Sequence, residues 1–416
     1  MLTVVQASAA ILADIGRQPT ERVSLLDSLG RVLANPVASP ISLPPWDNSA
    51  MDGYAVRGAD VEHAASEHPV RLRVIESVAA GAFPALTVTA GSATRIMTGA
   101  PVPGGADTVI RVEDTDDGRE HVVIRDGRDA FRNVRPRGED VRAGTVVCQS
   151  GTTVKPADVG ILAAIGCAEV EVYRLPRVAI LGSGDELVPI EQFEEVRAGR
   201  RIVSSNNYAL HALVRAAGGI PIDLGIAPDD PAALADHVKR ADGCDLLLTT
   251  AGVSVGEFDY TRQALERLGA SMKFWKVRMR PGAPLAFGSV SGMPWIGLPG
   301  NPVSTMVTFE LFVRPAIRKM LGHQHLFRRV VPVILEESVV TGPRLTHFLR
   351  AVVHLDSDRV ARARLTGPQG SSILSSMSLA NALLVVPEDQ PRTEAGETLN
   401  ALLLGDDIGA SEYLVL

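Results

Sequence analysis

The sequence predicts a multidomain protein of the α/β plus β class, in which a doubly wound α/β domain is combined with β-rich domains. The chain has 416 residues, and at about 150 residues per domain this corresponds to roughly three domains. Between residues 177 and 322, buried strand patterns alternate with helical patterns, as in a parallel sheet covered on both faces. Short strand patterns bounded by Gly and Asp lie on either side of that region.

The N-terminal region begins with a predicted helix. Thr3 and Gln6 form a capping-box pattern, and Val4, Ala7 and Ile11 recur at helical spacing. A second helical pattern covers residues 25–33. It is followed by a proline-rich connection that ends before residue 46, where helix is disfavoured. We therefore predict a domain boundary near residue 43.

A small β-rich domain is predicted to follow as an insertion. Its strand patterns alternate with turns rich in Gly and Asp, and the helical pattern of residues 156–165 then restores the character of the first region. The predicted strands are residues 70–74, 108–112, 122–124 and 146–148.

The α/β region contains predicted strands that are each followed by a helix. Its last helix, residues 302–321, has the clearest limits, because Asn301 suits the N-cap, Pro302 the first turn and Gly322 the end. Strand patterns then return, which predicts a C-terminal β-barrel or sandwich. In order, the predicted elements are strand 178–181, helix 207–217, strand 221–226, helix 231–239, strand 245–250, helix 261–268, helix 302–321, and strands 330–335, 348–355, 360–365 and 382–386.

These patterns predict four domains. They are a helical and β linking domain of residues 1–43 and 145–176, an inserted β-rich domain of residues 44–144, an α/β domain of residues 177–325 and a C-terminal β-barrel domain of residues 326–416.

Composition and charge argue against several classes of protein. Hydrophobic residues make up 46% and charged residues 21%, as in a folded globular protein. The formal net charge is −7, so the surface would repel a nucleic-acid backbone and no nucleic-acid partner is expected. No apolar stretch approaches the roughly 20 residues that cross a bilayer, so no membrane association is expected. The 3 cysteines fit neither disulfide nor zinc spacing, which predicts a cytoplasmic protein.

Glycine-containing loops follow strands of the α/β region at residues 182–186, 252–259 and 297–301. Glycine lets the backbone approach a ligand, and N–H groups at a helix start attract an oxyanion such as phosphate. Any one such loop could be a simple turn, but several at one sheet edge favour a binding site. The chain has no P-loop and no complete dinucleotide motif, which argues against nucleotide hydrolysis and hydride transfer.

Acidic side chains occupy the same strand ends. Asp185, Glu186 and Asp259 would repel a phosphate unless a hard cation lay between them, which favours Mg²⁺. Asp229 and Asp230 precede Pro231, where a helix cap is the simpler explanation.

The loop at residues 252–256 also matches the GxSxG pattern of a hydrolase nucleophile around Ser254. The match is weak, because Glu257 and Asp259 separate it from the next helix, and two acids would disfavour an oxyanion.

Cations occur where alternation would place Lys276, Arg278 and Arg280 on one face of a predicted strand. Such a face suits either an anion or solvent. In the first half of the chain, three loops mix hydroxyl, acidic and guanidinium groups and could close a cleft; they are residues 46–54, 95–101 and 135–140.

These segments resemble one family, the molybdopterin molybdenumtransferases of MoeA and the gephyrin E domain. The matching motifs come in the order of that family, so the resemblance extends over nearly the whole chain. They are DNSAMDGYAV (47–56), IMTGAP (96–101), RGED (137–140), SGDEL (183–187), GVSVGE (252–257), RPG (280–282), GLPGNPVS (297–304), FLR (348–350) and QGS (369–371).

The resemblance implies an elongated homodimer of four-domain subunits, with an α/β domain like that of molybdopterin adenylyltransferase. It implies that molybdate is inserted into adenylated molybdopterin, with Mg²⁺-dependent release of AMP, to give molybdenum cofactor. In that family the cleft lies between the α/β and C-terminal domains of one subunit and the β-rich domain of the other. Implied partners are a molybdopterin adenylyltransferase and proteins that deliver the cofactor to molybdoenzymes.

The resemblance also implies roles for individual residues. Arg280 and Ala283 stand where the family often has Lys. Arg280 keeps the charge but changes the geometry of the anion contacts. Ala283 lacks the charge, so either oxyanion affinity is weaker or this position is not a direct contact. The implied Mg²⁺ ligands are Glu186, Asp229 or Asp230, and Asp259. The implied catalytic residues are Asp52, Thr98 and Asp140 of the partner subunit, with Glu186, Asp259, Lys276 and Arg280. The implied substrate-binding residues are Ser183, Gly252, Ser254 and Gly300, with Ser304, Arg350 and Ser371 for molybdate.

Two other functions stay open. A molybdopterin adenylyltransferase would account for the α/β domain but leaves about two-thirds of the chain unexplained. A non-catalytic scaffold would need neither the acids at 186 and 259 nor the cations at 276, 280 and 350. Molybdate and tungstate are not distinguished, because both are tetrahedral dianions of nearly the same size.

Overall fold

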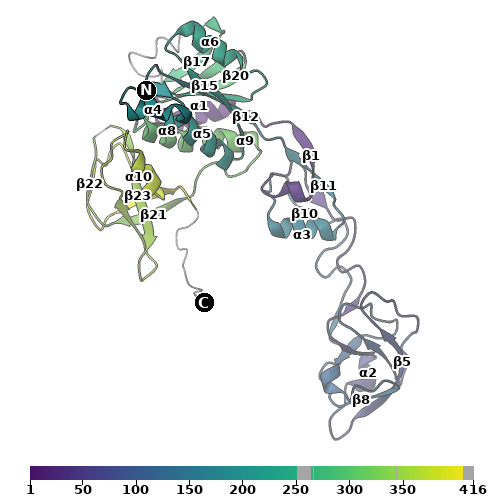
Figure 1. The fold of residues 1–416 in the computed structure, drawn as a ribbon. Helices are drawn as coiled ribbons and strands as arrows, with labels where there is room; N and C mark the ends of the chain where they lie inside the picture. The colour runs from purple at the N-terminus through teal and green to yellow at the C-terminus, as the bar shows by residue number, and fades with distance from the viewer. Residues whose placement is uncertain (251–263, 266, 343, 406–416) are drawn as a thin grey trace. The chain divides into compact units, whose positions relative to one another are not determined.

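The computed structural model describes residues 1–250, 264–265, 267–342 and 344–405, and the chain divides into two compact units (Figure 1). Unit 1 comprises Met1–Arg22 and Glu171–Leu416, and unit 2 comprises Val23–Val170. The chain passes from one unit to the other within two strands, β1 (Thr20–Ser24) and β11 (Glu169–Tyr173). In the described part of the chain, no helix combines the length and apolar character needed to cross a membrane.

Unit 1 is built around a six-stranded sheet with the strand order β15-β12-β16-β20-β19-β17. Strands β15, β12, β16 and β20 are parallel to one another, as predicted. Strands β19 and β17 add an antiparallel edge that the sequence patterns did not predict. The bounds are β12 Arg177–Ser183, β15 Ile220–Ala227, β16 Leu246–Thr250, β17 Ser271–Trp275, β19 Ala286–Val290 and β20 Met293–Leu298.

Helices cover both faces of this sheet, which confirms the predicted doubly wound α/β domain. Successive residues of a strand face opposite sides, and in β12 Val178 and Ile180 join one core while Ala179 and Leu181 join the other. The first core contains side chains of α1, α5, α8 and α9, and the second contains side chains of α6. These helices are α1 Val4–Asp14, α5 Ser205–Ala216, α6 Pro231–Lys239, α8 Pro302–Thr308 and α9 Arg314–Met320. Shorter elements of this domain are β13 Leu187–Val188, η3 Ile190–Gln192, α4 Phe193–Arg197 and β14 Ile202–Val203.

The long helix predicted for residues 302–321 is confirmed, with a widened turn in its middle. Helix α8 continues through a π-helical turn, η4 (Phe309–Val313), into α9. Pro315 has no N–H to donate to the carbonyl of Leu311, and its ring crowds that carbonyl, so the preceding turn widens. Gly322 follows the helix with φ +78°, the left-handed conformation expected at a helix end.

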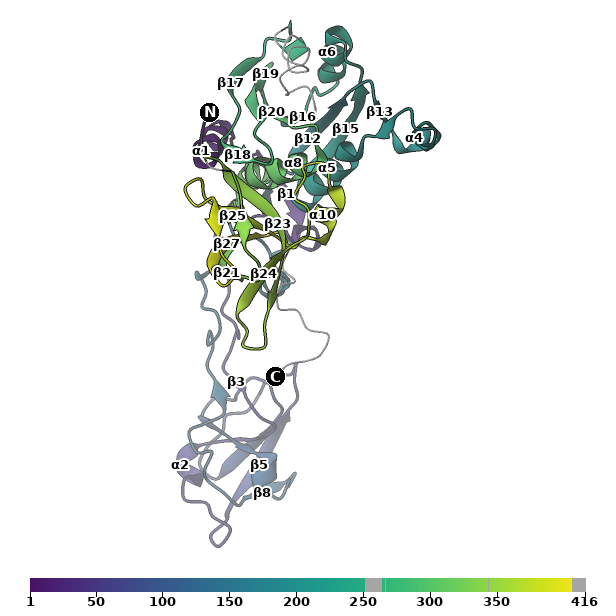
Figure 2. The ribbon, with the colours of Figure 1, turned by 90° about the vertical axis from the view of Figure 1, so that its left-hand side faces the viewer.

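The C-terminal part of unit 1 is a closed β-barrel, as predicted (Figure 2). Its strands pair in the order β23-β24-β21-β27-β25, and pairing of β25 with β23 closes the ring. Side chains such as Val333, Leu349, Leu384 and Ala401 form its core. The elements are β21 Val330–Leu335, β22 Val339–Val340, β23 Thr346–Leu355, β24 Ala361–Leu365, α10 Leu374–Leu379, β25 Ala382–Val386, β26 Arg392–Thr393 and β27 Thr398–Leu403.

Unit 2 contains the predicted β-rich fold, a five-stranded sheet with the order β7-β4-β6-β5-β8. Its core includes Tyr54, Leu72 and Ile110. The sheet strands are β4 Gly53–Val56, β5 Val70–Val78, β6 Ser92–Ile96, β7 Thr108–Arg111 and β8 His121–Ile124. The other elements are β2 Val37–Ala38, β3 Asn48–Ser49, α2 Gly58–Val61, η2 Val112–Asp114, β9 Val134–Arg135, β10 Val146–Cys148 and α3 Pro156–Ala164.

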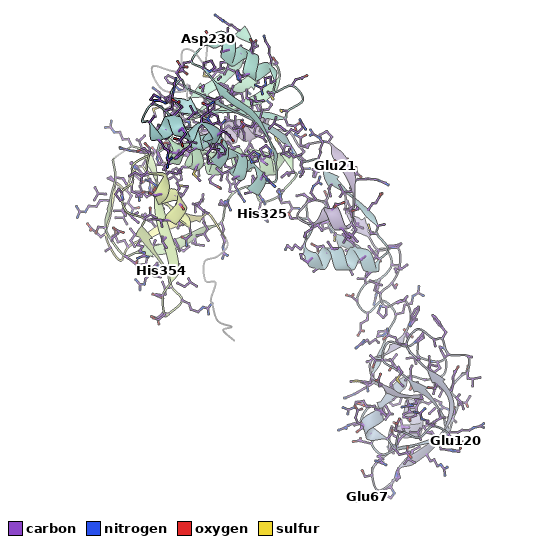
Figure 3. All side chains as sticks on the ribbon, viewed as in Figure 1. Glu21, Glu67, Glu120, Asp230, His325 and His354 are labelled. Carbon is purple, nitrogen blue, oxygen red and sulfur yellow. The ribbon has the colours of Figure 1, made fainter. Side chains whose placement is uncertain are left out.

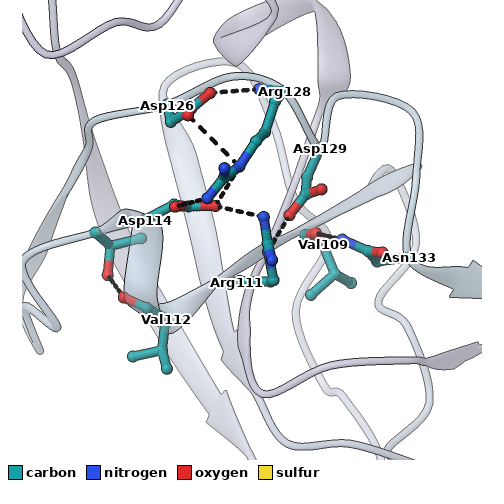
Figure 4. Close-up of polar contacts among 9 residues, drawn as sticks. Val109, Arg111, Val112, Asp114, Asp126, Arg128, Asp129 and Asn133 are labelled. Carbon is teal, nitrogen blue, oxygen red and sulfur yellow. Dashed lines mark hydrogen bonds and ion pairs between the residues drawn. The ribbon is translucent and has the colours of Figure 1, made fainter.

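A network of ion pairs joins the end of β7 to the loop after β8 (Figure 4). Arg111 binds Asp129 at 2.9 Å and Asp114 at 3.2 Å, and Arg128 binds Asp114 at 2.5 Å. The hydrogen bond from Arg128 to Asp114 raises the pKa of the Arg128 guanidinium. The network holds two loops of unit 2 together and is a structural feature.

The prediction of a helix over residues 25–33 is wrong. The chain forms only a short 3₁₀ turn, η1 (Leu26–Ser28), and Gly30 has φ +77°. Leu26 and Leu29 are 82% and 58% exposed, so the apolar spacing that suggested a helix does not correspond to a buried face.

His323, just after α9, carries a prediction about pH. Burial and the nearby Arg318 and Arg314 lower the pKa of its imidazole to about 4, and Arg318 Nη2 donates to the neutral Nδ1 at 3.2 Å. The unfolded chain binds a proton near pH 6.5 whereas the folded chain does not, so stability falls as pH drops below 6.5. Between pH 6.5 and 5 we expect a loss of about 2 kcal/mol from this group.

Urea unfolding at pH 7, 6 and 5 measures this effect. His323→Gln is expected to flatten the pH dependence, whereas His325→Gln, a change at an exposed neighbour, leaves it intact. A Trp46→Phe background restricts tryptophan fluorescence to Trp275 and Trp295, which both belong to unit 1. Equal pH dependence in both His variants would exclude His323 as the source.

Candidate functional site at the strand ends of unit 1

The carboxyl ends of β12, β16 and β20 lie side by side, because these parallel strands are neighbours in the sheet. The loops that start at Gly184 and at Pro299 therefore meet at one edge, as predicted. Ser183, at the end of β12, is buried and its Oγ donates to the carbonyl of Thr250 at the end of β16, at 3.4 Å. The loop after β16 lies outside the described residues, and with it the predicted site residues Gly252, Ser254 and Asp259.

A cavity of about 540 Å³ lies at this edge, and we refer to it as the strand-end cavity. Glu186 of the loop after β12, Thr250 of β16 and Gly300 of the loop after β20 line it. The start of α5 and Ser372 of the C-terminal segment complete the described wall. The α/β domain and the C-terminal segment of the same unit thus form this cavity together.

Residues before and within the first turn of α5 line the cavity, and sequence reasoning missed them. Asn206 Nδ2 donates to the carbonyl of Gly300 at 2.7 Å, which ties α5 to the loop after β20. Asn207 Nδ2 donates to the carbonyl of Gly225 at 3.1 Å. Four polar residues in succession, Ser204 to Asn207, were a usable signal, but the helix was predicted to begin only at residue 207.

The acids at this edge differ in their roles. Asp185 and Asp229 each accept a weak hydrogen bond from the backbone N–H of the other, at 3.3 to 3.4 Å. Asp230 caps α6 (Figure 3), since its Oδ1 accepts from the N–H groups of Ala232 and Ala233 at 3.1 and 2.8 Å. Glu186 is exposed and faces the strand-end cavity.

The donors around Glu186 fit a hard cation. The hydroxyl Oγ1 of Thr250 is buried in the cavity wall and has no hydrogen-bond partner among the described residues. A carboxylate together with a hydroxyl oxygen is the chemistry that Mg²⁺ prefers. Over residues 1–250, 264–265, 267–342 and 344–405, no three acidic, His or Cys side chains are grouped as a metal site, so Asp259 would be needed beside Glu186.

A buried cation lies close to the start of α8. Arg350, on β23, is 0% exposed; its Nε donates to Ser376 Oγ at 3.0 Å and its Nη2 to the carbonyl of Gly370 at 2.9 Å. Its Nη1 is buried without a hydrogen-bond partner among the described residues. Burial lowers the pKa of Arg350. A buried guanidinium without a carboxylate partner is costly and favours an anion beside it.

The segment after Gly370 links Arg350 to α8. The carbonyl of Ser371 accepts from the N–H of Val303 at 3.1 Å. Ser304 follows in the first turn of α8 and is 4% exposed. The structure therefore brings Arg350, Ser371 and Ser304 together, next to the cavity wall formed by Ser372.

The prediction of one strand through Lys276, Arg278 and Arg280 is wrong, although the alternation is real. Val277 and Met279 are buried and the cations are less so. However, β17 ends at Trp275, and Lys276 has φ +78° with its Nζ 4.0 Å from the Trp275 ring centroid. The following residues form β18 (Met279–Arg280) on the barrel strand β23.

This break separates the predicted cations. Arg280 pairs with His347 on β23, the strand that carries Arg350, whereas Lys276 lies at the end of β17. The turn at Gly282 lies against α8: φ is +102°, and a Cβ there would lie 2.5 Å from Cγ2 of Thr308. Only glycine fits this position without a shift of α8.

Unit 2 holds the remaining predicted residues. Asp52 Oδ1 accepts from the N–H and from the hydroxyl of Thr98, both at 2.7 Å, and these bonds lower the pKa of Asp52. Both residues are exposed. Asp140 is exposed in another loop, where its N–H donates to the carbonyl of Leu43 at 3.0 Å.

Three family models match this chain in succession. They are the MoeA N-terminal region (domains I and II) over residues 2–166, a probable molybdopterin binding domain over residues 179–319, and the MoeA C-terminal region (domain IV) over residues 331–404.

Named relatives and a solved structure agree with these models. A molybdopterin molybdenumtransferase of Nostoc is 39% identical and covers 93% of this chain and 89% of its own length. Molybdopterin molybdenumtransferase 2 of Mycobacterium tuberculosis is 39% identical, with 91% and 93% covered. The crystal structure of a molybdopterin biosynthesis MoeA protein from Pyrococcus horikoshii has a TM-score of 0.82 at 32% identity and covers 97% of this chain and 100% of its own. The predicted resemblance is confirmed: this chain belongs to the molybdopterin molybdenumtransferase (MoeA) family, and it is a transferase of molybdenum-cofactor biosynthesis.

Proposed function

We propose that this protein inserts molybdate into adenylated molybdopterin at the strand-end cavity of unit 1, with Mg²⁺-dependent release of AMP. The observation that carries the proposal is Arg350, a fully buried guanidinium whose Nη1 lacks a partner among the described residues, beside the start of α8 and the cavity wall. A tetrahedral dianion would supply the missing acceptor.

The reaction brings two anions together, and this repulsion is the main obstacle. Arg350 would bind molybdate through its guanidinium, and the hydroxyl groups of Ser304 and Ser371 would orient the oxygens. The dipole of the helix that starts with α8, together with the N–H of Ser304 in its first turn, adds positive potential for the same anion. Arg280, beside β23, would add charge from the barrel side. Holding both reactants in the cavity lowers the barrier through proximity and charge compensation, without a protein nucleophile.

The nucleotide phosphate would lie where the loops after β12, β16 and β20 begin. Gly300 is held by Asn206, so its backbone is positioned for a phosphate. Gly252 and Ser254 would contribute from the loop after β16. Glu186 and Asp259 would hold Mg²⁺, with Asp229 nearby and Thr250 Oγ1 as a further oxygen donor. When bound, Mg²⁺ would neutralise the phosphate oxygens of the departing AMP.

The direct test uses the purified protein with adenylated molybdopterin, Mg²⁺ and molybdate. We expect AMP release and formation of active cofactor, both dependent on molybdate, and omission of molybdate is the control. Tight binding of the adenylate without turnover would contradict the proposal and favour a scaffold. Formation of the adenylate from ATP and molybdopterin would favour the adenylyltransferase alternative.

The proposal includes a homodimer, in which Asp52, Thr98 and Asp140 of one subunit complete the site of the other. The proposal also includes partners of the same pathway. They are an adenylyltransferase that supplies the substrate and proteins that deliver the product. A cytoplasmic location is consistent with Cys148, Cys167 and Cys244, which are all free.

Mixing two inactive variants tests the shared site. At the molybdate concentration that gives the wild type half its maximal rate, Asp52→Asn and Arg350→Gln are each expected to lower activity more than tenfold, because each removes a charged group from the site. A mixed dimer keeps one site with both residues intact, so co-expression should restore a substantial part of the activity. If the mixture is no more active than the two variants separately, Asp52 does not act from the partner subunit.

A further inference from the structure

We propose that a second cavity of unit 1, between α9 and the β-barrel, binds an organic phosphate with a ring, the chemical class of the nucleoside phosphates. This cavity has a volume of about 600 Å³, within the usual range of small-ligand sites. It shares no described lining residue with the strand-end cavity. We refer to it as the arginine cavity.

Four arginines line the arginine cavity: Arg314 and Arg318 of α9, and Arg328 and Arg329 of the segment that leads into β21. None of its described lining residues is acidic. The nearest carboxylate with a described bond to this group is Glu310, which is 5% exposed and lies in the π-helical turn η4. π-helical turns are frequent at functional sites.

Glu310 compensates only part of the positive charge of these arginines. Its carboxylate accepts from Nε and Nη2 of Arg328, at 2.8 and 3.2 Å, and lies 3.9 Å from Nε of Arg314. Arg318 donates instead to two neutral groups. They are Nδ1 of His323 and, at 2.9 Å, the carbonyl of His325, a residue labelled in Figure 3. Arg329 is exposed, and its guanidinium has no hydrogen bond or ion pair within the described residues.

The electrostatics follow from this arrangement. Burial, and then the charge of Arg328, lower the pKa of Arg318. Arg318 and Arg329 have no carboxylate partner among the described residues and lie in the same lining as Arg328, so an anion bound there is favoured. Guanidinium groups form paired hydrogen bonds with phosphate oxygens, which a single chloride cannot accept. A carboxylate can accept one such pair, whereas a phosphate has more oxygens and more charge to share among several arginines.

The arginine cavity also has an apolar lining. It includes Val331, Leu355, Ala361 and Leu403 of the barrel, and Phe327, which is 54% exposed. An inorganic ion would leave this apolar lining unused. A ligand with a phosphate at one end and a planar ring at the other would contact both the arginines and the apolar side chains, with the ring against Phe327.

Titration calorimetry of the full-length protein with ADP tests the proposal. At the arginine cavity we expect saturable binding of one ADP per chain, weakened by salt, with inorganic phosphate at least tenfold weaker because it lacks the ring. ADP bound at the strand-end cavity would be a separate event, which Arg329→Gln leaves unchanged. Arg329→Gln and Arg318→Gln should each weaken ADP about tenfold, the loss of one charge-assisted hydrogen bond. Arg364→Gln, at an exposed arginine of β24 that does not line the cavity, is the matched control and should bind as wild type.

Two further variants separate this site from other occupants. Ser372→Asp places a carboxylate in the strand-end cavity. If this variant loses ADP binding while Arg329→Gln keeps it, ADP binds in the strand-end cavity and the proposal is overturned. Asp406 and Asp407 follow the lining residue Gly405 in the sequence, outside the described residues. Binding seen only in the Asp406→Asn, Asp407→Asn double variant would mean that the chain's own acids are the occupants, and would also overturn it. The proposal would also be overturned if inorganic phosphate bound as tightly as ADP, or if ADP showed no saturable binding.

Discussion

Glu186→Gln and Asp259→Asn are each expected to lower Mg²⁺-dependent turnover by about a hundredfold or more while the protein stays folded. Removing a charged group that stabilises developing charge typically costs about 3 to 4 kcal/mol of transition-state stabilisation. Glu186 and Thr250 both line the strand-end cavity, and the Thr250 hydroxyl has no partner among the described residues, so under the proposed function the Glu186 carboxylate would hold the cation. AMP release at increasing Mg²⁺ measures the effect, and the Mg²⁺ concentration for half-maximal rate should rise.

A neighbouring acid provides the matched control for Glu186. Asp185 is next in the chain, does not line the strand-end cavity, and is bonded to the backbone of Asp229. Asp185→Asn should therefore keep most of the activity and the wild-type Mg²⁺ dependence. Wild-type Mg²⁺ dependence in Glu186→Gln would exclude Glu186 as a ligand, and a loss of the same size in Asp185→Asn would show a general charge effect.

Arg350→Gln is expected to raise the molybdate concentration for half-maximal turnover by about 30- to 1,000-fold. This range corresponds to about 2 to 4 kcal/mol for a buried, charge-assisted contact with an anion. The guanidinium is fully buried, and its Nη1 has no hydrogen-bond partner in the part of the chain that the structure describes. Turnover at saturating molybdate should change much less, because the variant leaves intact the loops that are proposed to hold the nucleotide.

Arg350 also holds the structure together, and a second variant separates the two roles. Its Nε donates to Ser376, so Ser376→Ala removes one structural bond and keeps the guanidinium. We expect Ser376→Ala to lower the melting temperature while its molybdate dependence stays within about threefold of wild type. Unchanged molybdate dependence in Arg350→Gln would remove this residue from the anion site.

Local patterns predicted much of the fold correctly, because they depend on neighbours in the chain. The capping box of Thr3 and Gln6 is present with both hydrogen bonds, at 3.0 and 3.1 Å. The limits of the helix from Pro302 were also predicted correctly, since proline and glycine restrict φ wherever they occur. The same reasoning failed at residues 25–33, where Leu26 and Leu29 are exposed while Val32 and Leu33 are buried, so the apolar residues do not form one buried helical face.

The sites show the limit of local reasoning most clearly. Alternation along residues 276–280 was predicted, but its assignment to one strand was wrong, because Arg280 pairs with β23 of the barrel. The periodicity of the sequence does not predict that the Asn206 side chain donates to the carbonyl of Gly300. Nor does it predict that the carbonyl of Ser371 accepts from the N–H of Val303. Contacts of this kind join residues far apart in the chain, and a periodic pattern identifies a face without identifying its partner.

The sequence by itself determined the α/β plus β class, the order of strands and glycine loops, the acids at the strand ends and the family. These follow from local conformational preferences and from motifs that are contiguous in the chain. Only the tertiary structure decided that Arg350 is buried with an unused donor, that Ser372 joins the strand-end cavity, and that four arginines meet at α9. Burial and charge compensation depend on which distant segments pack together, and packing is set by the whole chain.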